Sequence, residues 1–93
     1  MPPLDLGKDL GIERAEELKQ QLLEQVESGR SVVLDGASVE RVHGAAMQLL
    51  AAFFREREAA GRKTRIDAPS SALSEAARVM ALSGILGLPE SGD

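Results

Sequence analysis

The fold is decided by the stretch Ser31–Leu50, which reads SVVLDGASVERVHGAAMQLL. Its first part, Ser31–Asp35, is a short apolar run with β-branched residues, which is typical of a strand buried on both faces of a parallel sheet. A turn follows at Asp35–Ser38. Apolar residues then recur at helical spacing, which predicts a helix that begins near Gly44 and stops at Gly61. A strand that leads through a loop into an amphipathic helix is part of a β-α-β unit.

The apolar face of this helix is wider than one core contact requires. At 100° per residue its apolar side chains span an arc of about 160°, against the ~100° stripe that suffices to face a core. The excess predicts either additional core or a margin that faces a partner. Such a margin would also allow self-association through an exposed Met47 or Phe54. The apolar side chains are Ala46, Met47, Leu49, Leu50, Phe53 and Phe54.

We expect a strand and a helix before this stretch. Leu4–Leu6 is a candidate strand that ends at Gly7, and Gly11 precedes apolar residues that are three and four positions apart. Gly29 is the expected C-terminal cap of this helix. The apolar pattern consists of Ile12, Ala15, Leu18, Leu22 and Val26.

A third strand and a third helix are expected after it. Lys63–Asp67 combines charged and apolar positions, and Ser70 is the expected N-cap of the helix that follows. Strands that alternate with helices predict an α/β fold, with a small, mainly parallel β-sheet in one domain over residues 1–93. The side chains expected to point inward from the third helix and the tail are Leu73, Ala76, Ala77, Met80, Ile85, Leu86 and Leu88.

Charge and composition argue against several kinds of partner. The formal net charge is −4, which disfavours nucleic acid and anionic membrane surfaces. There is no cysteine, no apolar run near the ~18 residues of a membrane span, and no secretory signal pattern, so we expect a cytoplasmic protein without direct membrane insertion. Basic residues do cluster late in the chain, but they interleave with two glutamates, which predicts a solvated strand edge rather than a phosphate-binding stripe. The cluster is Arg57, Arg62, Lys63 and Arg65, with Glu56 and Glu58.

The sequence offers little catalytic chemistry. His43 is the only histidine, no Ser–His–acid set can be argued around it, and neither common glycine-rich phosphate loop occurs, so we expect no enzyme activity, no metal site and no cofactor. His43 is either a capping or solvated loop residue or a contact residue on a recognition surface. The small residues Gly44, Ala45 and Ala46 open the helix, and they too allow two interpretations. Either they let a partner approach accessible helix N–H groups, or Gly44 is a simple N-cap followed by helix formers.

The order of these elements and their local patterns resemble STAS domains, the family of anti-sigma-factor antagonists. In that family a buried strand ends in Asp, a loop with a spaced valine leads to an Asp-Ser or Asp-Thr pair, and the next helix opens with small residues and a Leu-Leu. The similarity extends over roughly Leu4–Leu88. It is carried by Val32–Asp35, Val39–Leu50, Ala60–Arg62, Thr64–Ile66 and the pair Pro69-Ser70.

The resemblance implies a small β-sheet with helices packed on one side, without the N-terminal hairpin strand of longer members. It also implies a non-enzymatic bacterial signalling domain that binds a protein partner: a signalling kinase, an anti-sigma factor or a chemotaxis component. The short form resembles chemotaxis-associated members. The docking surface that it implies is the loop and the start of the second helix. Partner-binding residues are then expected at Ser38, His43, Gly44, Ala45, Ala46 and Met47.

The sequence departs from the family at the residue that is usually phosphorylated. His43 and Gly44 stand where members have Asp-Ser or Asp-Thr, and glycine has no hydroxyl that could accept a phosphate. Ser38 is a candidate substitute in the preceding loop. The alternative function is an accessory STAS subunit of an ABC-type lipid transporter, although such subunits usually keep the Asp-Thr or Asp-Ser pair. The sequence also allows a homodimer.

Overall fold

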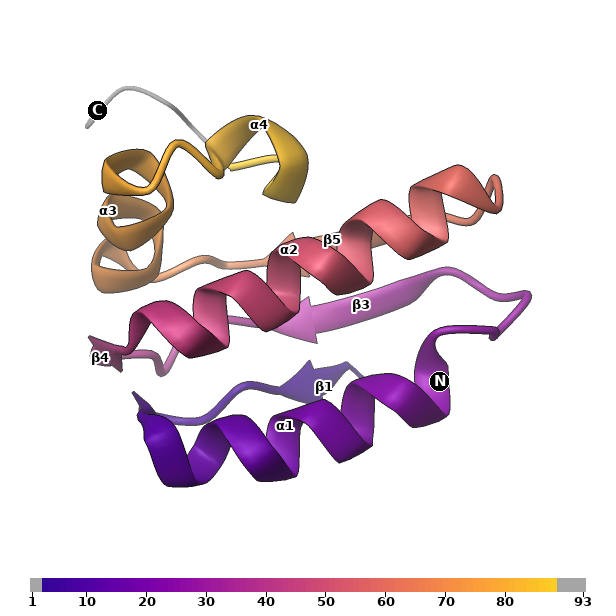
Figure 1. The fold of residues 1–93 in the computed structure, drawn as a ribbon. Coiled ribbons are helices and arrows are strands. Elements are labelled where there is room, and N and C mark those ends of the chain that lie inside the picture. The colour runs from indigo at the N-terminus through magenta and orange to yellow at the C-terminus, as the bar shows by residue number, and fades with distance from the viewer. Residues whose placement is uncertain (1–2, 89–93) are drawn as a thin grey trace.

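The computed structural model describes residues 3–88, in which strands alternate with helices (Figure 1). This arrangement confirms the predicted α/β fold. The two short strands β2 and β4 and the short helix α4 are additional to the predicted elements. The order along the chain is β1 (Leu4–Asp5), β2 (Asp9–Leu10), α1 (Ile12–Gln25), β3 (Val32–Asp35), β4 (Arg41–Val42), α2 (Gly44–Ala59), β5 (Thr64–Asp67), α3 (Ser71–Val79) and α4 (Ser83–Leu86).

Parallel strand pairs form the scaffold. The main sheet has three strands in the order β1-β3-β5, and β2 pairs with β4 in a separate two-stranded sheet. Leu34 of the central strand β3 lies between Leu4 of β1 and Ile66 of β5 in register. All pairings among the described strands are parallel, as predicted.

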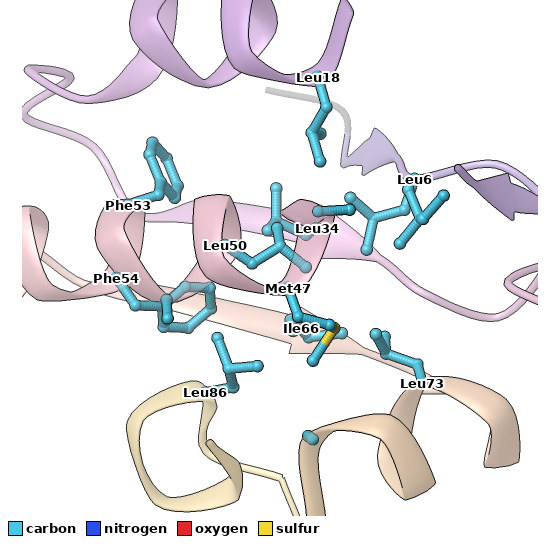
Figure 2. Close-up of a cluster of buried hydrophobic side chains, with 14 of the residues drawn as sticks. Leu6, Leu18, Leu34, Met47, Leu50, Phe53, Phe54, Ile66, Leu73 and Leu86 are labelled. Atoms are coloured by element: carbon cyan, nitrogen blue, oxygen red, sulfur yellow. The ribbon is translucent and has the colours of Figure 1, made fainter. Parts of the chain in front are cut away.

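Helices cover only one face of the main sheet. Leu34 and Ile66 are buried on the face toward α2 (Figure 2), whereas Val33 is half-buried and Arg65 is exposed on the other face. Successive side chains of a strand point to opposite faces, so one face of β3 meets the helices and the other meets solvent. The prediction that Ser31–Asp35 is buried on both faces is therefore wrong, and the prediction of helices on one side is confirmed.

The central helix α2 fills the core. Met47 and Leu50 have no exposed area and belong to the same buried cluster as Leu34 and Ile66 of the sheet, while Phe54 lies near Leu86 of α4 (Figure 2). Since α1, α3 and α4 all contact α2, its wide apolar face belongs to the core. The prediction of self-association through an exposed Met47 or Phe54 is wrong, because both side chains are buried.

Arg57 on α2 is a fully buried cation. Its guanidinium donates hydrogen bonds to the hydroxyl of Thr64 (2.6 Å) and to the carbonyl of Lys63 (2.8 Å). Burial lowers the pKa of Arg57, and the charge of Arg62 lowers it further. The placement of Arg57 on a solvated edge is therefore wrong, and hydrogen bonds to neutral oxygens offset the cost of burying its charge. Its other acceptors are the carbonyls of Gln25, Val26, Ser28 and Arg30, at 2.7–3.4 Å.

Arg57 donates hydrogen bonds to the chain where α1 ends. This helix stops at Gln25, so the prediction that Gly29 caps it is wrong. The carbonyls of Gln25 and Ser28 accept from Arg57, and that of Gln25 also accepts from the N–H of Ser28 (3.0 Å) in a tighter final turn. The buried face of α1 is as predicted and consists of Ala15, Leu18 and Leu22.

The same type of turn ends α2, α3 and α4. In the turn after α3, the N–H of Ala81 donates to the carbonyl of Arg78 (3.1 Å), and that of Leu82 donates to the carbonyl of Ala77 (2.7 Å). This is the Schellman motif, in which one residue adopts a left-handed conformation that favours glycine. That residue is Gly61 after α2 (φ 73°), Gly87 after α4 (φ 67°) and Ala81 after α3 (φ 58°).

Candidate functional site

Backbone hydrogen bonds hold the loop between β3 and α2 at both ends. At its start, the N–H of Gly36 donates to the carbonyl of Asp67 (3.1 Å), and the carbonyl of Gly36 accepts from the N–H of Ser70 (3.0 Å). At its end, the N–H of His43 donates to the carbonyl of Leu10 (2.9 Å). The loop is thus fixed between the main sheet, the start of α3 and β2.

His43 is the N-cap of α2. Its ring Nδ1 accepts a hydrogen bond from the N–H of Ala45 (3.2 Å), and its carbonyl accepts from Ala46 (3.0 Å) and Met47 (3.3 Å). The capping interpretation of His43 is confirmed. The N–H groups of Ala45, Ala46 and Met47 thus already have acceptors on His43, whereas access of a partner to the N–H of Gly44 stays a prediction.

The six expected partner-binding residues divide into two groups by exposure. Ser38, His43, Gly44 and Ala45 are exposed, so they are available for contact. Ala46 and Met47 have no exposed area, because they lie on the side of α2 that packs into the core. Their assignment to the partner surface is therefore wrong, because they pack in the core beneath the exposed residues.

A groove lies beside the exposed start of α2. It has a volume of about 370 Å³, and it runs between Gly44, β4 and α3, which lie at the same end of the molecule (Figure 1). Val79 on α3 lines this groove and is 69% exposed. The lining residues are Glu40, Val42, Gly44, Ala72, Glu75, Ala76, Val79 and Met80.

The contribution of α3 to this groove was not anticipated from the sequence. Ser70 caps the helix as predicted, since its hydroxyl accepts from the N–H of Leu73 (3.1 Å). A signal for this apolar stripe was present, because Ala72 and Ala76, which are half-buried, and the exposed Val79 are four and three positions apart and so share one helical face. Periodicity identifies this second apolar stripe, but it does not say whether another element covers it.

Gly44 keeps the groove open at the start of α2. A Cβ atom at this position would lie 3.8 Å from Met80 Cε, which is ordinary van der Waals contact. A serine or threonine here would therefore fit without a clash, and its side chain would narrow the gap between α2 and α3. The glycine removes both the hydroxyl and this bulk.

The charges at the rim of the groove are largely paired. Glu40 lies 3.8 Å from Lys8, and both side chains are exposed. Glu75 accepts hydrogen bonds from Arg78, and this contact lowers the pKa of Glu75 while it raises the pKa of Arg78. The groove therefore combines an apolar floor with ion pairs at its edge, a pattern suited to an apolar anchor side chain of a protein.

The site contains no arrangement for bond-making chemistry. The ring of His43 is used as a helix cap, and no nucleophile contacts it among the hydrogen bonds of residues 3–88. Over the same range, no group of three or more acidic or histidine side chains is placed to hold a metal ion. None of the helices between residues 3 and 88 combines the length and apolarity needed to cross a membrane.

Comparison with models of known protein families identifies a related family. A family model described as "Mlab, STAS domain" matches residues 2–88, which is nearly the whole chain. No curated protein matches the chain.

Proposed function

The chain belongs to the STAS domain family, and from this premise we propose that it is a non-enzymatic signalling domain that binds one protein partner at the groove beside Gly44. Domains of this family generally mediate protein–protein interactions and are not enzymes. The proposed docking surface consists of Ser38, His43, Gly44 and Ala45 together with the α3 residues Ala72, Ala76, Val79 and Met80.

The exposed Val79 beside Gly44 is the observation that supports this proposal most directly. At 69% exposure, its burial by a partner would gain about 25 cal/mol for each Å² of apolar surface removed from water. The groove next to it also gives an anchor side chain a place to enter. Interfaces depend on a few such anchors at their centre, surrounded by a polar rim.

The partner we expect is a bacterial signalling kinase, an anti-sigma factor or a chemotaxis component in the cytoplasm. Phosphorylation of the residue at position 44 cannot control the interaction, because glycine carries no hydroxyl. Control would therefore come from the partner or from the amount of protein. Ser38 is exposed and stays a candidate for modification.

A charge placed on each side of the groove tests this proposal. Tagged wild-type protein and the variants Ala45→Glu, Val79→Glu and Ala59→Glu would be used to capture partners from a lysate of the source cell, with mass spectrometry as the readout. Ala59→Glu is the matched control, because it puts the same substitution on an exposed position at the other end of α2. We expect wild type and Ala59→Glu to capture the same signalling protein, and the two groove variants to lose it. Retention of that protein by both groove variants would contradict the site.

A second candidate function is that of an accessory subunit of an ABC-type lipid transporter. Membership of the STAS family is compatible with this candidate too, because such subunits also resemble short STAS domains. The same capture distinguishes them, because a transporter ATPase that depends on Ala45 and Val79 would support the accessory subunit. Neighbouring genes for a permease and an ATPase, rather than for receptors and histidine kinases, would support it independently.

A further inference from the structure

The strand β5 has one free edge in the described structure. The carbonyls of Lys63 and Asp67 accept hydrogen bonds from Val32 (3.0 Å) and Gly36 (3.1 Å), so the peptide groups of these alternate residues face β3. Peptide groups alternate in direction along a strand, and those of Thr64 and Ile66 therefore face away from β3. Among the strands between residues 3 and 88, none pairs with this side of β5. The edge thus offers backbone donors and acceptors to an added strand.

A second groove runs along this free edge. It has a volume of about 490 Å³ and lies between β5, the C-terminal half of α2 and the segment that contains α4. Its floor includes the buried side chains of Phe54 and Leu86, and the half-buried Ile85 gives a side chain of an extended peptide an apolar surface to pack on. The complete lining is Ser31, Val32, Phe54, Glu58, Arg62, Lys63, Thr64, Arg65, Ile66, Gly84, Ile85, Leu86 and Gly87.

The groove is positively charged although the protein is acidic. Its lining carries Arg62, Lys63 and Arg65 against a single acidic residue, Glu58, whereas the whole chain has a net charge of −4. Arg65 pairs with Asp67, and Arg62 donates to the carbonyl of Val26, but Lys63 has no ion-pair partner within residues 3–88. Local charge of this sign favours an acidic occupant.

We propose that an extended, acidic segment of a partner protein adds to the edge of β5 as a further strand. The backbone of Thr64 and Ile66 would supply the hydrogen bonds, and Lys63 and Arg65 would select for acidic side chains. A second copy of this chain is disfavoured, since its own β5 edge carries Lys63 and Arg65 against a single acidic residue, Asp67. Nucleic acid could interact with the positive charge of the groove, but it could not form the strand hydrogen bonds that the backbone N–H and C=O groups of the β5 edge offer.

This surface is separate from the one proposed above. Gly44 is the first residue of α2, whereas Glu58 lies in its last turn, and a helix of 16 residues is about 24 Å long. Loss of binding at one end of α2 therefore does not imply loss at the other. The two surfaces would allow one domain to hold two segments of a partner, or two partners.

A synthetic peptide tests the proposal on the unmodified protein. The probe is an acetylated, amidated hexapeptide of alternating glutamate and valine, titrated into ¹⁵N-labelled protein and followed by amide chemical shifts. We expect shifts at Thr64, Ile66 and Gly84–Gly87. One control peptide has lysine in place of glutamate, and a second has N-methyl groups on alternate backbone amides. Each control is expected to bind about tenfold more weakly, because it loses charge complementarity or strand hydrogen bonds.

A protein variant supplies the reciprocal control. Lys63→Glu combined with Arg65→Glu alters two exposed side chains. This double variant should bind the glutamate peptide more weakly than wild type and the lysine peptide more tightly. The proposal is overturned if the glutamate peptide causes no shifts at about 1 mM, a concentration that would reveal weak affinity. It is equally overturned if both charge types or the N-methylated peptide bind alike, or if a uridine hexanucleotide binds in preference. Shifts at Thr64 and Ile66 that depend on protein concentration alone would assign the edge to a second copy, and that also overturns it.

Discussion

Gly36 and Leu73 approach so closely that a side chain at position 36 would collide with the leucine. A Cβ atom on Gly36 would lie 2.7 Å from Leu73 Cδ2 and 3.1 Å from Ile66 Cγ2. Gly36 follows β3 directly, and Leu73 is the first buried residue of α3. This contact sets how near α3 comes to the sheet, and with it the position of the groove between α3 and the start of α2.

Gly36→Ala is expected to lower the free energy of unfolding by about 1–3 kcal/mol, because an added methyl group in a packed core forces neighbours to shift. Urea denaturation would measure the change. Gly29→Ala is the control, since a Cβ atom there meets nothing within 4 Å. In a Leu73→Ala background the cost of Gly36→Ala should shrink, and an unchanged cost would show that the contact with Leu73 is not its cause.

Arg57→Lys is expected to lower the free energy of unfolding by about 3 kcal/mol, because an ammonium group cannot reach the acceptors that the planar guanidinium serves, which leaves buried carbonyls unpaired. The exposed Arg55→Lys serves as the control on the same helix. Thermal or urea denaturation gives the comparison. Equal effects of the two substitutions would show that the buried hydrogen bonds of Arg57 contribute little.

Ala81→Gly is expected to stabilise the protein by about 0.5–1 kcal/mol, because a left-handed conformation costs an alanine about 1–2 kcal/mol and glycine loses part of this gain to chain entropy. The reverse change, Gly61→Ala, occupies the equivalent turn after α2 and should destabilise by a similar amount. Opposite signs for the two variants in calorimetry would support this account of the turns, whereas equal signs would refute it.

Glu75 provides a pH-dependent prediction. Its hydrogen bond and charge contact with Arg78 lower the pKa of Glu75 in the folded protein. A lowered folded pKa means that the contribution to stability is present above the pKa of the unfolded chain and is lost as the pH falls through the folded value. Arg78→Gln should therefore destabilise more at pH 7 than in acid below the usual range of glutamate. The carboxyl ¹³C titration of Glu75 should shift to higher pH in this variant, and an unchanged titration would contradict the contact.

Gly44→Asp separates the fold from partner binding. A carboxylate at the start of α2 interacts favourably with the helix dipole, so we expect stability to rise by about 0.3–1 kcal/mol. The aspartate side chain also narrows the groove and places a negative charge in it, so capture of the partner should fall. Gly44→Ser, which fits against Met80, is the neutral control and should keep most of the binding. Full capture by Gly44→Asp would remove this residue from the docking surface.

Periodicity predicted the strands of the main sheet and the helices α1, α2 and α3, because burial of one apolar face per helix determines them, but it did not predict β2, β4 or α4. Periodicity also indicated a buried position for Arg57, but the charge of the residue argued against it. Arg57 stands four positions after Phe53 and three after Phe54, on the inward face of α2, yet its charge suggested solvent. The carbonyls that make its burial tolerable come from the end of α1 and from the start of β5. No local sequence pattern in those segments predicts that their carbonyls accept hydrogen bonds from Arg57.

The candidate site was predictable in part. The resemblance placed it at the start of α2, and the exposure of His43, Gly44 and Ala45 agrees with that position. The assignment of partner-binding roles to Ala46 and Met47 failed, because successive residues of a helix point in different directions. A run that begins on the exposed face at Gly44 and Ala45 therefore reaches the buried face within two residues. The α3 wall could not be placed from sequence, since its distance from α2 depends on the packing of Gly36.

The hydrogen bonds of Arg57 bear on how the protein folds. Its acceptors lie 6 to 32 positions away along the chain, at the end of α1, in the segment before β3 and at β5. A partly assembled chain that buried this cation would lack some of these acceptors, and such an intermediate would be high in free energy. We therefore expect α1, α2 and β5 to form in one cooperative transition, without a populated state in which only part of the domain is ordered.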